Sequence, residues 1–112
     1  ANLKTDFFQD RIFVLTPKGD VIDLPSGSTV IDFAFQVHTE IGLHAKSARI
    51  NGKYSALKTT LESGDIVDVE TSKESHPSSK WLDLVITANA RKHIKTYLKE
   101  NGSVLQRWMQ RG

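Results

Sequence analysis

The chain has 112 residues, of which 38% are hydrophobic and 25% charged, an ordinary composition for one globular domain. It has no cysteine, which excludes a disulfide framework and a thiolate metal site. No apolar run is long enough to cross a bilayer and no signal-peptide pattern is present, so we expect a cytoplasmic protein with no membrane partner.

The net charge of +2 is unevenly distributed along the chain. Residues 1–79 carry 8 Lys and Arg against 11 Asp and Glu, whereas residues 80–112 carry 7 against 2. This split predicts a compact domain followed by a basic segment with different partners. A simpler interpretation is a helix with a solvated basic face.

Two apolar runs near the start of the chain predict a β-hairpin. Residues 11–16 form a dense run that is typical of a strand largely buried on both faces. Residues 21–24 predict a second strand with Ile22 and Leu24 directed inward. The Pro-Lys-Gly-Asp sequence between the runs predicts a turn, because proline fixes φ and glycine permits a positive φ.

The next stretch carries a strong helical signal. Apolar residues recur with a period of 3.6 and so predict an amphipathic helix; they are Val30, Phe33, Ala34, Val37 and Ile41. Thr29 is the expected N-cap, with Asp32 as its capping-box partner, and Gly42 is the expected C-cap. His38 falls at the edge of the apolar stripe, where the simplest role is a hydrogen bond to a nearby carbonyl group.

The remaining elements of the domain are short. The predictions are a strand at 47–50, an Asn-Gly hairpin turn at 51–52, an edge strand at 54–57, a loop at 59–65 and a strand with one wet face at 66–71. Together the elements form an α+β fold in the order of the ubiquitin-like β-grasp. We therefore predict a β-grasp domain over residues 10–72.

Residues 73–112 are predicted to form a linker and a basic helical extension, the start of a helical domain. We expect an apolar cluster to cover a flank of the domain or meet a neighbour: Trp81, Leu82, Leu84, Val85 and Ile86. Thr87 is the expected N-cap of a helix that ends at Asn101-Gly102. Its apolar face is Ala90, Ile94, Tyr97 and Leu98, and its basic face is Arg91, Lys92, Lys95 and Lys99. A further helix is suggested by Leu105, Trp108 and Met109.

The motifs of common enzyme classes are missing. The sequence has no Gly-rich phosphate loop, no nucleophile elbow and no metal-type spacing among its four histidines. Asp65 is most simply a turn residue, and Asp68 and Glu70 belong to the wet face of a strand. We expect no catalytic residue, no metal and no cofactor, which leaves a small α+β binding or regulatory module.

Several segments resemble a TGS domain. They read FVLTPKGD at 13–20, DLPSGST at 23–29, DFAF at 32–35, VHTEIG at 37–42, ARINGK at 48–53 and LESGDIV at 61–67. The chain is most similar to the TGS domain of long RelA/SpoT-type enzymes, which make and degrade (p)ppGpp in the stringent response. Residues 77–82 and 87–94 resemble the segment after TGS in those enzymes. The resemblance implies a non-catalytic regulatory fragment, with hydrolase and synthetase domains upstream.

The resemblance also implies a partner. In ribosome-bound members the TGS domain contacts the 3′ CCA end of an uncharged tRNA, and the family histidine matches His38. The implied RNA-binding residues are His38, Thr39, His44, Lys46 and Arg49, with the basic helix on RNA or ribosome. Many members carry His-Arg after the glycine, where this chain has Leu43-His44, so His44 would replace the basic side chain. The alternative is a protein-interaction module that docks the catalytic half or another protein.

Overall fold

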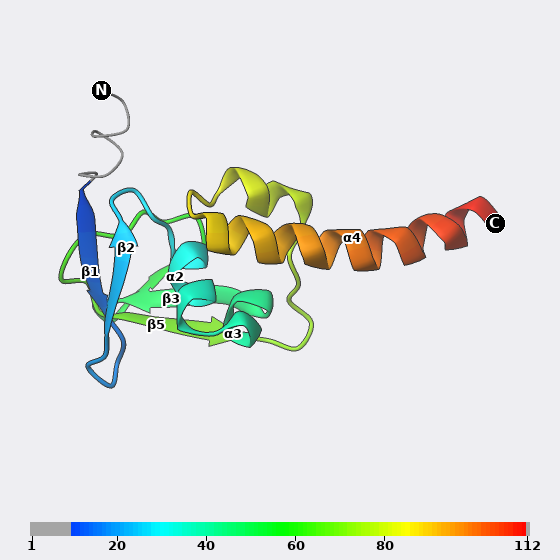
Figure 1. The fold of residues 1–112 in the computed structure, drawn as a ribbon. Helices are drawn as coiled ribbons and strands as arrows, with labels where there is room; N and C mark the ends of the chain where they lie inside the picture. The colour runs from blue at the N-terminus through cyan, green and yellow to red at the C-terminus, as the bar shows by residue number, and fades with distance from the viewer. Residues whose placement is uncertain (1–9, 112) are drawn as a thin grey trace, which may run out of the picture.

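A computed structural model describes residues 10–111 of the chain, with side chains described for residues 10–101 (Figure 1). The elements are β1 (Arg11–Leu15), β2 (Val21–Pro25), α2 (Val30–Val37), α3 (Thr39–Leu43), β3 (Ala45–Ile50), β4 (Lys53–Ser55), β5 (Val67–Thr71), the 3₁₀ helix η1 (Ser79–Asp83) and α4 (Ala88–Arg111). This arrangement confirms the predicted α+β class, with a β-grasp domain followed by a helix.

The strands form two small antiparallel sheets, β1–β2 and β4–β3–β5. A parallel bridge between Leu15 and Ile66 connects them, and the Leu15 amide donates to the Asp65 carbonyl at 2.8 Å. The bridge therefore places the end of β1 beside the start of β5. Helices α2 and α3 lie against the sheet strands in Figure 1.

β1 is buried on one face only. Ile12 and Val14 are buried, whereas Phe13 between them is 50% exposed. The prediction of a strand buried on both faces was wrong, because α2 covers only the inner side of the hairpin. An ion pair at 2.8 Å between Arg11 and Asp23 lies among the exposed residues of the hairpin.

The Asn-Gly turn forms as predicted. Asn51 and Gly52 have φ of 53° and 86°, the positive values that this hairpin turn requires. The Asn51 side chain also donates to Asp65 Oδ1 at 2.9 Å and accepts from the Ile66 amide at 2.9 Å. The turn is thereby fixed to the start of β5. The edge strand spans Lys53–Ser55, so it begins one residue before and ends two residues before the predicted 54–57.

The predicted capping box is present at α2, but the predicted single helix is not. The Thr29 side chain accepts from the Asp32 amide, and the Asp32 carboxylate accepts from the Thr29 amide. α2 then ends at Val37, because His38 is extended (φ −168°, ψ 140°) and separates it from α3. Gly42 is not a C-cap. It lies inside α3, where a Cβ atom would overlap the Phe35 ring.

α2 is buried from two sides. One core cluster consists of Ile12, Val14, Leu24, Val30, Phe33, Ala48, Leu61 and Val67. A second consists of Ile31, Ala34, Phe35, Ala45, Trp81, Val85, Ala90 and Ile94. The predicted stripe divides between the two clusters. Val30 and Phe33 belong to the first, whereas Ala34 belongs to the second together with Ile31 and Phe35, which the stripe did not include.

The segment after β5 completes this second core. Trp81 and Val85 are buried, so the apolar cluster at 81–86 covers a flank of the domain. The Thr87 hydroxyl accepts from the Ala90 amide at 3.2 Å, which confirms the predicted N-cap. The boundary that we predicted between residues 72 and 73 stays a prediction.

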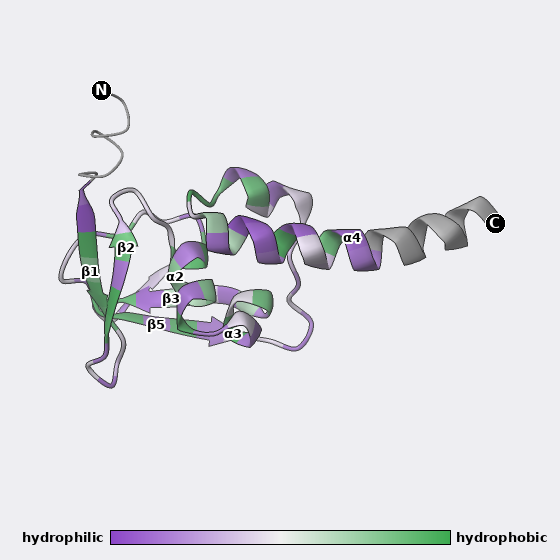
Figure 2. Ribbon diagram, viewed as in Figure 1, coloured by the Kyte–Doolittle hydropathy of each residue, from purple (hydrophilic) through white to green (hydrophobic). Residues whose placement is uncertain are grey.

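In the part of α4 that Figure 2 colours by hydropathy, hydrophilic and hydrophobic residues alternate. It continues to Arg111, so the predicted end at Asn101-Gly102 was wrong. A glycine inside a helix costs only about 1 kcal/mol and does not by itself end one. The predicted second helix falls within α4, and its apolar side chains lie outside the described set. Among the described residues, no helix is both long and apolar enough to span a membrane.

Candidate nucleic-acid interface

His38 occupies the junction between α2 and α3. Its amide donates to the Ala34 carbonyl at 3.1 Å and so closes α2, while its Nδ1 accepts from the Glu40 amide at 3.0 Å and so caps α3. The residue is exposed. An accepting Nδ1 carries no proton, so in the neutral ring the proton lies on Nε2. The junction thus holds an exposed ring with one committed nitrogen and one nitrogen that can donate.

The carbonyl bond that we expected for His38 belongs instead to His44. His44 Nδ1 lies 3.1 Å from the Ser75 carbonyl oxygen, and its Nε2 lies 3.8 Å from the Glu40 carboxylate. Its ring meets the His76 ring edge-on at 5.3 Å, and His76 stacks on Tyr97 at 5.7 Å. His44 is therefore engaged in fixing the segment after β5 to α3.

The two predicted basic residues of β3 differ in their surroundings. Arg49 forms an ion pair with Glu70 at 3.1 Å, and Glu70 also accepts from the Ser47 hydroxyl at 3.0 Å. The hydrogen bond from Arg49, followed by that from Ser47, lowers the pKa of Glu70 below its ordinary value. Lys46 is exposed and forms no ion pair with the described residues. Lys46 is thus the freer cation of the two.

The predicted RNA-binding residues therefore fall into two groups. His38, Thr39 and His44 lie on α3 and its two caps. Arg49 lies between buried Ala48 and half-buried Ile50 on β3, so its side chain projects from the opposite face of the strand. The structure brings the first group together and places Lys46 and Arg49 on a different element, β3.

Two hollows border α3. One of about 250 Å³ is lined by Glu40, Ile41, His44, Thr71, Ser72 and Lys73. A smaller one of about 120 Å³ is lined by Thr16, Pro17, Phe33, Val37, Ile41, Val67, Asp68 and Val69. The sequence reasoning missed Lys73, because only the pairing of Ala45 with Thr71 brings the end of β5 beside His44. Residue spacing carries no signal for that proximity.

The basic residues of α4 form a separate surface. Arg91, Lys92, Lys95 and Lys99 are all exposed. The first three border a hollow of about 370 Å³ together with Ile86 and Ala88. α4 contacts α2 through other residues. The Asn89 side-chain amide donates a hydrogen bond to Gln36 Oε1, and His93 stacks on Phe35. The basic face is thus directed away from that contact.

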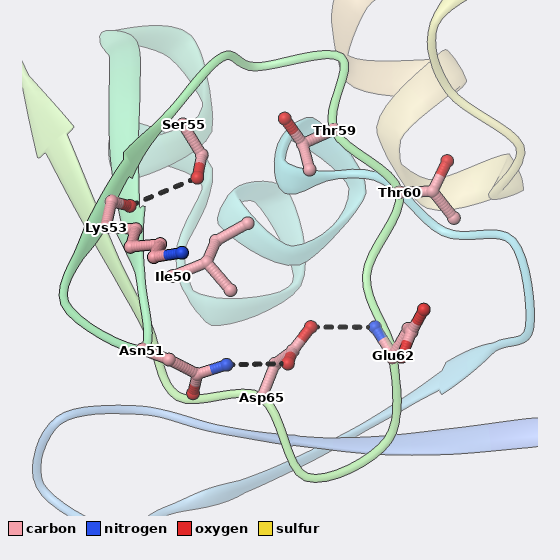
Figure 3. Close-up of a pocket in the computed structure, with 8 residues that line it drawn as sticks. All are labelled: Ile50, Asn51, Lys53, Ser55, Thr59, Thr60, Glu62 and Asp65. Atoms are coloured by element: carbon pink, nitrogen blue, oxygen red, sulfur yellow. Dashed lines mark hydrogen bonds between the residues drawn. The ribbon is translucent and has the colours of Figure 1, made fainter.

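The largest of these hollows, about 390 Å³, lies between the β3–β4 turn and the 59–65 loop (Figure 3). The Asp65 carboxylate is the central group, and Figure 3 shows it between Asn51 and the backbone of Glu62. Both of its oxygens accept hydrogen bonds there, at 2.9 and 2.8 Å. Asp65 therefore stabilises the loop, as expected of a turn residue, and the hollow contains no predicted site residue.

Metal ligands are not gathered anywhere in the described part of the chain. No group of three or more His, Asp or Glu side chains there is placed to hold a metal ion. Beside the exposed Glu40 carboxylate, the α3 region presents the His38 imidazole and the Lys73 ammonium group. Groups of this kind recognise aromatic rings, phosphate oxygens and hydroxyl groups.

Comparison with known proteins identifies the family. The model of the TGS domain family matches residues 12–71. A probable guanosine-3′,5′-bis(diphosphate) 3′-pyrophosphohydrolase of Synechocystis is 48% identical over 100 residues, which are 89% of this chain and 13% of the relative. The pyrophosphohydrolase of Aquifex aeolicus is 46% identical over 88% of this chain and 14% of its own length.

A third relative, the bifunctional (p)ppGpp synthase/hydrolase RelA of Mycobacterium tuberculosis, is 46% identical over 86% of this chain and 13% of its own length. The chain thus spans about an eighth of the length of the curated relatives that it matches. The family match covers more than half of the chain and the fold agrees with it. The chain belongs to the TGS domain family, and its relatives over this region are RelA/SpoT-type enzymes of (p)ppGpp metabolism.

Proposed function

We propose that this chain is a non-catalytic regulatory domain of a (p)ppGpp synthetase/hydrolase and that it senses the 3′ CCA end of uncharged tRNA on the ribosome. The observation that carries the proposal is the exposed His38 ring, held at the α2–α3 junction by the hydrogen bond from the Glu40 amide. A ring fixed in this way is ordered before any ligand binds, which lowers the entropic cost of binding.

The chemistry of a single-stranded RNA end suits this site. Unpaired bases bind proteins by stacking on rings and by hydrogen bonds to their exposed edges. His38 offers a ring face and, in the neutral form, an Nε2–H donor. Lys73 supplies positive charge in the hollow beside His44, and Lys46 supplies it close by in the sequence, whereas the charge of Arg49 is offset by Glu70. Residues 1–79 have a net charge of −3, so recognition must be local.

The first test is an NMR titration of this chain with a short CCA-ended RNA at low and at moderate salt. We expect chemical-shift changes centred on residues 38–46. A blunt-ended duplex RNA, which lacks the single-stranded CCA end, serves as the control. Shifts confined to residues 91–99 that vanish as salt rises would mean only that a basic helix meets phosphate.

Two variants separate the ring of His38 from its role as a helix cap. His38→Asn keeps a side chain that accepts at an N-cap but removes the imidazole, whereas His38→Ala removes both. If the ring stacks on a base, both variants should bind the RNA end about 5- to 150-fold more weakly, the range for losing one stacking contact. Wild-type affinity in His38→Asn would contradict the site assignment.

The alternative function is protein docking. The apolar cluster at 81–86 no longer supports it, because Trp81 and Val85 are buried within the domain. A different observation favours it: Phe13, Val21 and Ile66 are 46–60% exposed on or beside the β1–β2 hairpin. Absence of shifts with the RNA, together with capture of the catalytic half that persists at high salt, would replace the first proposal with this one.

A further inference from the structure

Asp32 is the most heavily hydrogen-bonded side chain among the described residues. Its exposed fraction is 0%, and its two carboxylate oxygens accept from five donor groups. Two belong to Thr29, whose amide lies at 3.0 Å and hydroxyl at 3.3 Å. The other three belong to Ile86 and Thr87, which follow Asp32 by 54 and 55 positions in the chain. They are the Ile86 amide at 3.2 Å, the Thr87 amide at 3.0 Å and the Thr87 hydroxyl at 2.6 Å. No Lys, Arg or His forms an ion pair with it in the described part of the chain.

These donors come from the starts of two different helices. Thr29 is the N-cap of α2, and Thr87 caps α4 by accepting from the Ala90 amide at 3.2 Å. The Thr87 hydroxyl can accept from Ala90 while its own hydrogen points to Asp32. A capping box needs only the bonds to Thr29. The bonds to Ile86 and Thr87 exceed that need, and they join the start of α4 to the first turn of α2.

The other contacts between the two helices are apolar packing, one ring stack and one exposed hydrogen bond. In the first turn of α4, Asn89 forms an exposed 3.4 Å hydrogen bond with Gln36. Further along, Ile94 packs in the apolar cluster that contains Phe35, and His93 stacks on the Phe35 ring. Apolar packing is non-directional, whereas hydrogen bonds to a buried carboxylate fix position and angle. In Figure 1 α4 starts beside α2 and runs past the rest of the fold, so a small change at its start is magnified at its far end.

We propose that Asp32 is a positioning residue that couples α2, the helix that ends at the His38 junction, to the direction in which α4 leaves the domain. α2 has only eight residues, so Asp32 and the His38 junction lie near the two ends of one short rigid rod. Displacement of α2 at the junction moves the Asp32 carboxylate, and the first turn of α4 follows it. This coupling does not depend on which ligand the junction binds.

The test uses three variants of this chain. Asp32→Asn replaces an acceptor oxygen by a donor, and Thr87→Val removes only the hydroxyl on the α4 side. Thr29→Val is the matched control, because it removes the same group on the α2 side of the same carboxylate. Since the chain has no cysteine, Lys53→Cys and Lys99→Cys allow spin labels on exposed sites of the sheet and of α4.

We expect one narrow distance distribution between the labels in the parent and in Thr29→Val, and a broad one in Thr87→Val and Asp32→Asn. The Ile86 and Thr87 amides should exchange about tenfold or more faster in Asp32→Asn, the effect expected when a hydrogen bond is lost, while β3 and β5 amides keep their protection. Parent-like widths in Thr87→Val, or equal broadening in Thr29→Val, would overturn the coupling. If Asp32→Asn does not fold, Thr87→Val still decides the result.

Discussion

The two hydrophobic cores on either side of α2 differ in where their residues come from. The first is built from the β-strands, α2 and the loop before β5, all between Ile12 and Val67. The second needs Trp81, Val85 and Ile94 from the segment after β5. Six consecutive residues of α2, from Val30 to Phe35, are buried as a result. A helix that is apolar on more than one side signals a second layer that covers it.

The largest effect should come from removing the second core altogether. A chain that stops at residue 72 loses Trp81, Val85 and Ile94, each of which contributes about 1.5–3 kcal/mol when buried. The free energy of unfolding of a small domain is only about 5–15 kcal/mol. We therefore expect the truncated chain to be largely unfolded and to show no cooperative thermal transition. Circular dichroism and calorimetry would measure it.

The matched control is a chain that stops at residue 101, which retains every residue of both cores that the structure describes. It should melt cooperatively close to the Tm of the full chain. A cooperative transition in the 72-residue chain would show that the first core suffices, and it would support the predicted domain boundary.

A smaller effect is expected at Gly42, where the second core meets α3. An added Cβ would overlap the ring of Phe35, which is only 3% exposed. We expect Gly42→Ala to destabilise the chain by about 1–3 kcal/mol, the usual cost of overpacking, although alanine favours a helix. Urea unfolding measures this cost. Adding Phe35→Leu to Gly42→Ala should recover part of the loss, and an unchanged midpoint in Gly42→Ala alone would contradict the close approach.

The smallest effect should come from Glu70, on the open face of β5. Its pKa is lowered from 4.5, first by the Arg49 hydrogen bond and then by that of Ser47. A lowered folded-state pKa adds stability above the unfolded value, and this stability is lost as the pH falls through the folded value. The Tm of the parent should therefore exceed that of Glu70→Gln at pH 7, and the difference should shrink below pH 4.5. A difference that is independent of pH would exclude this ionic contribution.

Local signals in the sequence predicted the local features of the fold. The capping box of Thr29 and Asp32, the Asn51-Gly52 turn and the N-cap at Thr87 each depend on residues within a few positions of one another. The break at His38 escaped this reasoning, since its side chain replaces a helical hydrogen bond at a point where the apolar period continues. Periodicity alone cannot reveal such a replacement.

The long-range contacts could not be predicted from local sequence signals, for a different reason. The ion pair of Arg49 with Glu70 is a diagonal contact between β3 and β5, because the register places Arg49 opposite Asp68 and Ser47 opposite Glu70. The position of Lys73 follows from the end of β5. The bonds from Ile86 and Thr87 to Asp32 span more than fifty positions. Nothing in the residue pattern near Asp32 distinguishes an ordinary capping carboxylate from one that also holds a second helix. The assignment of His38 to RNA came from the resemblance and stays a prediction.

The late origin of the second core has a consequence for how the chain is made. During synthesis the first core has all of its residues once Val67 has emerged, whereas the second waits for Ile94. At about 5–20 residues per second, this interval of roughly 27 residues lasts about 1–5 s. Throughout that time Ile31 and Phe35 have no covering helix, so the nascent domain presents an apolar surface to the chaperones and neighbouring chains around it.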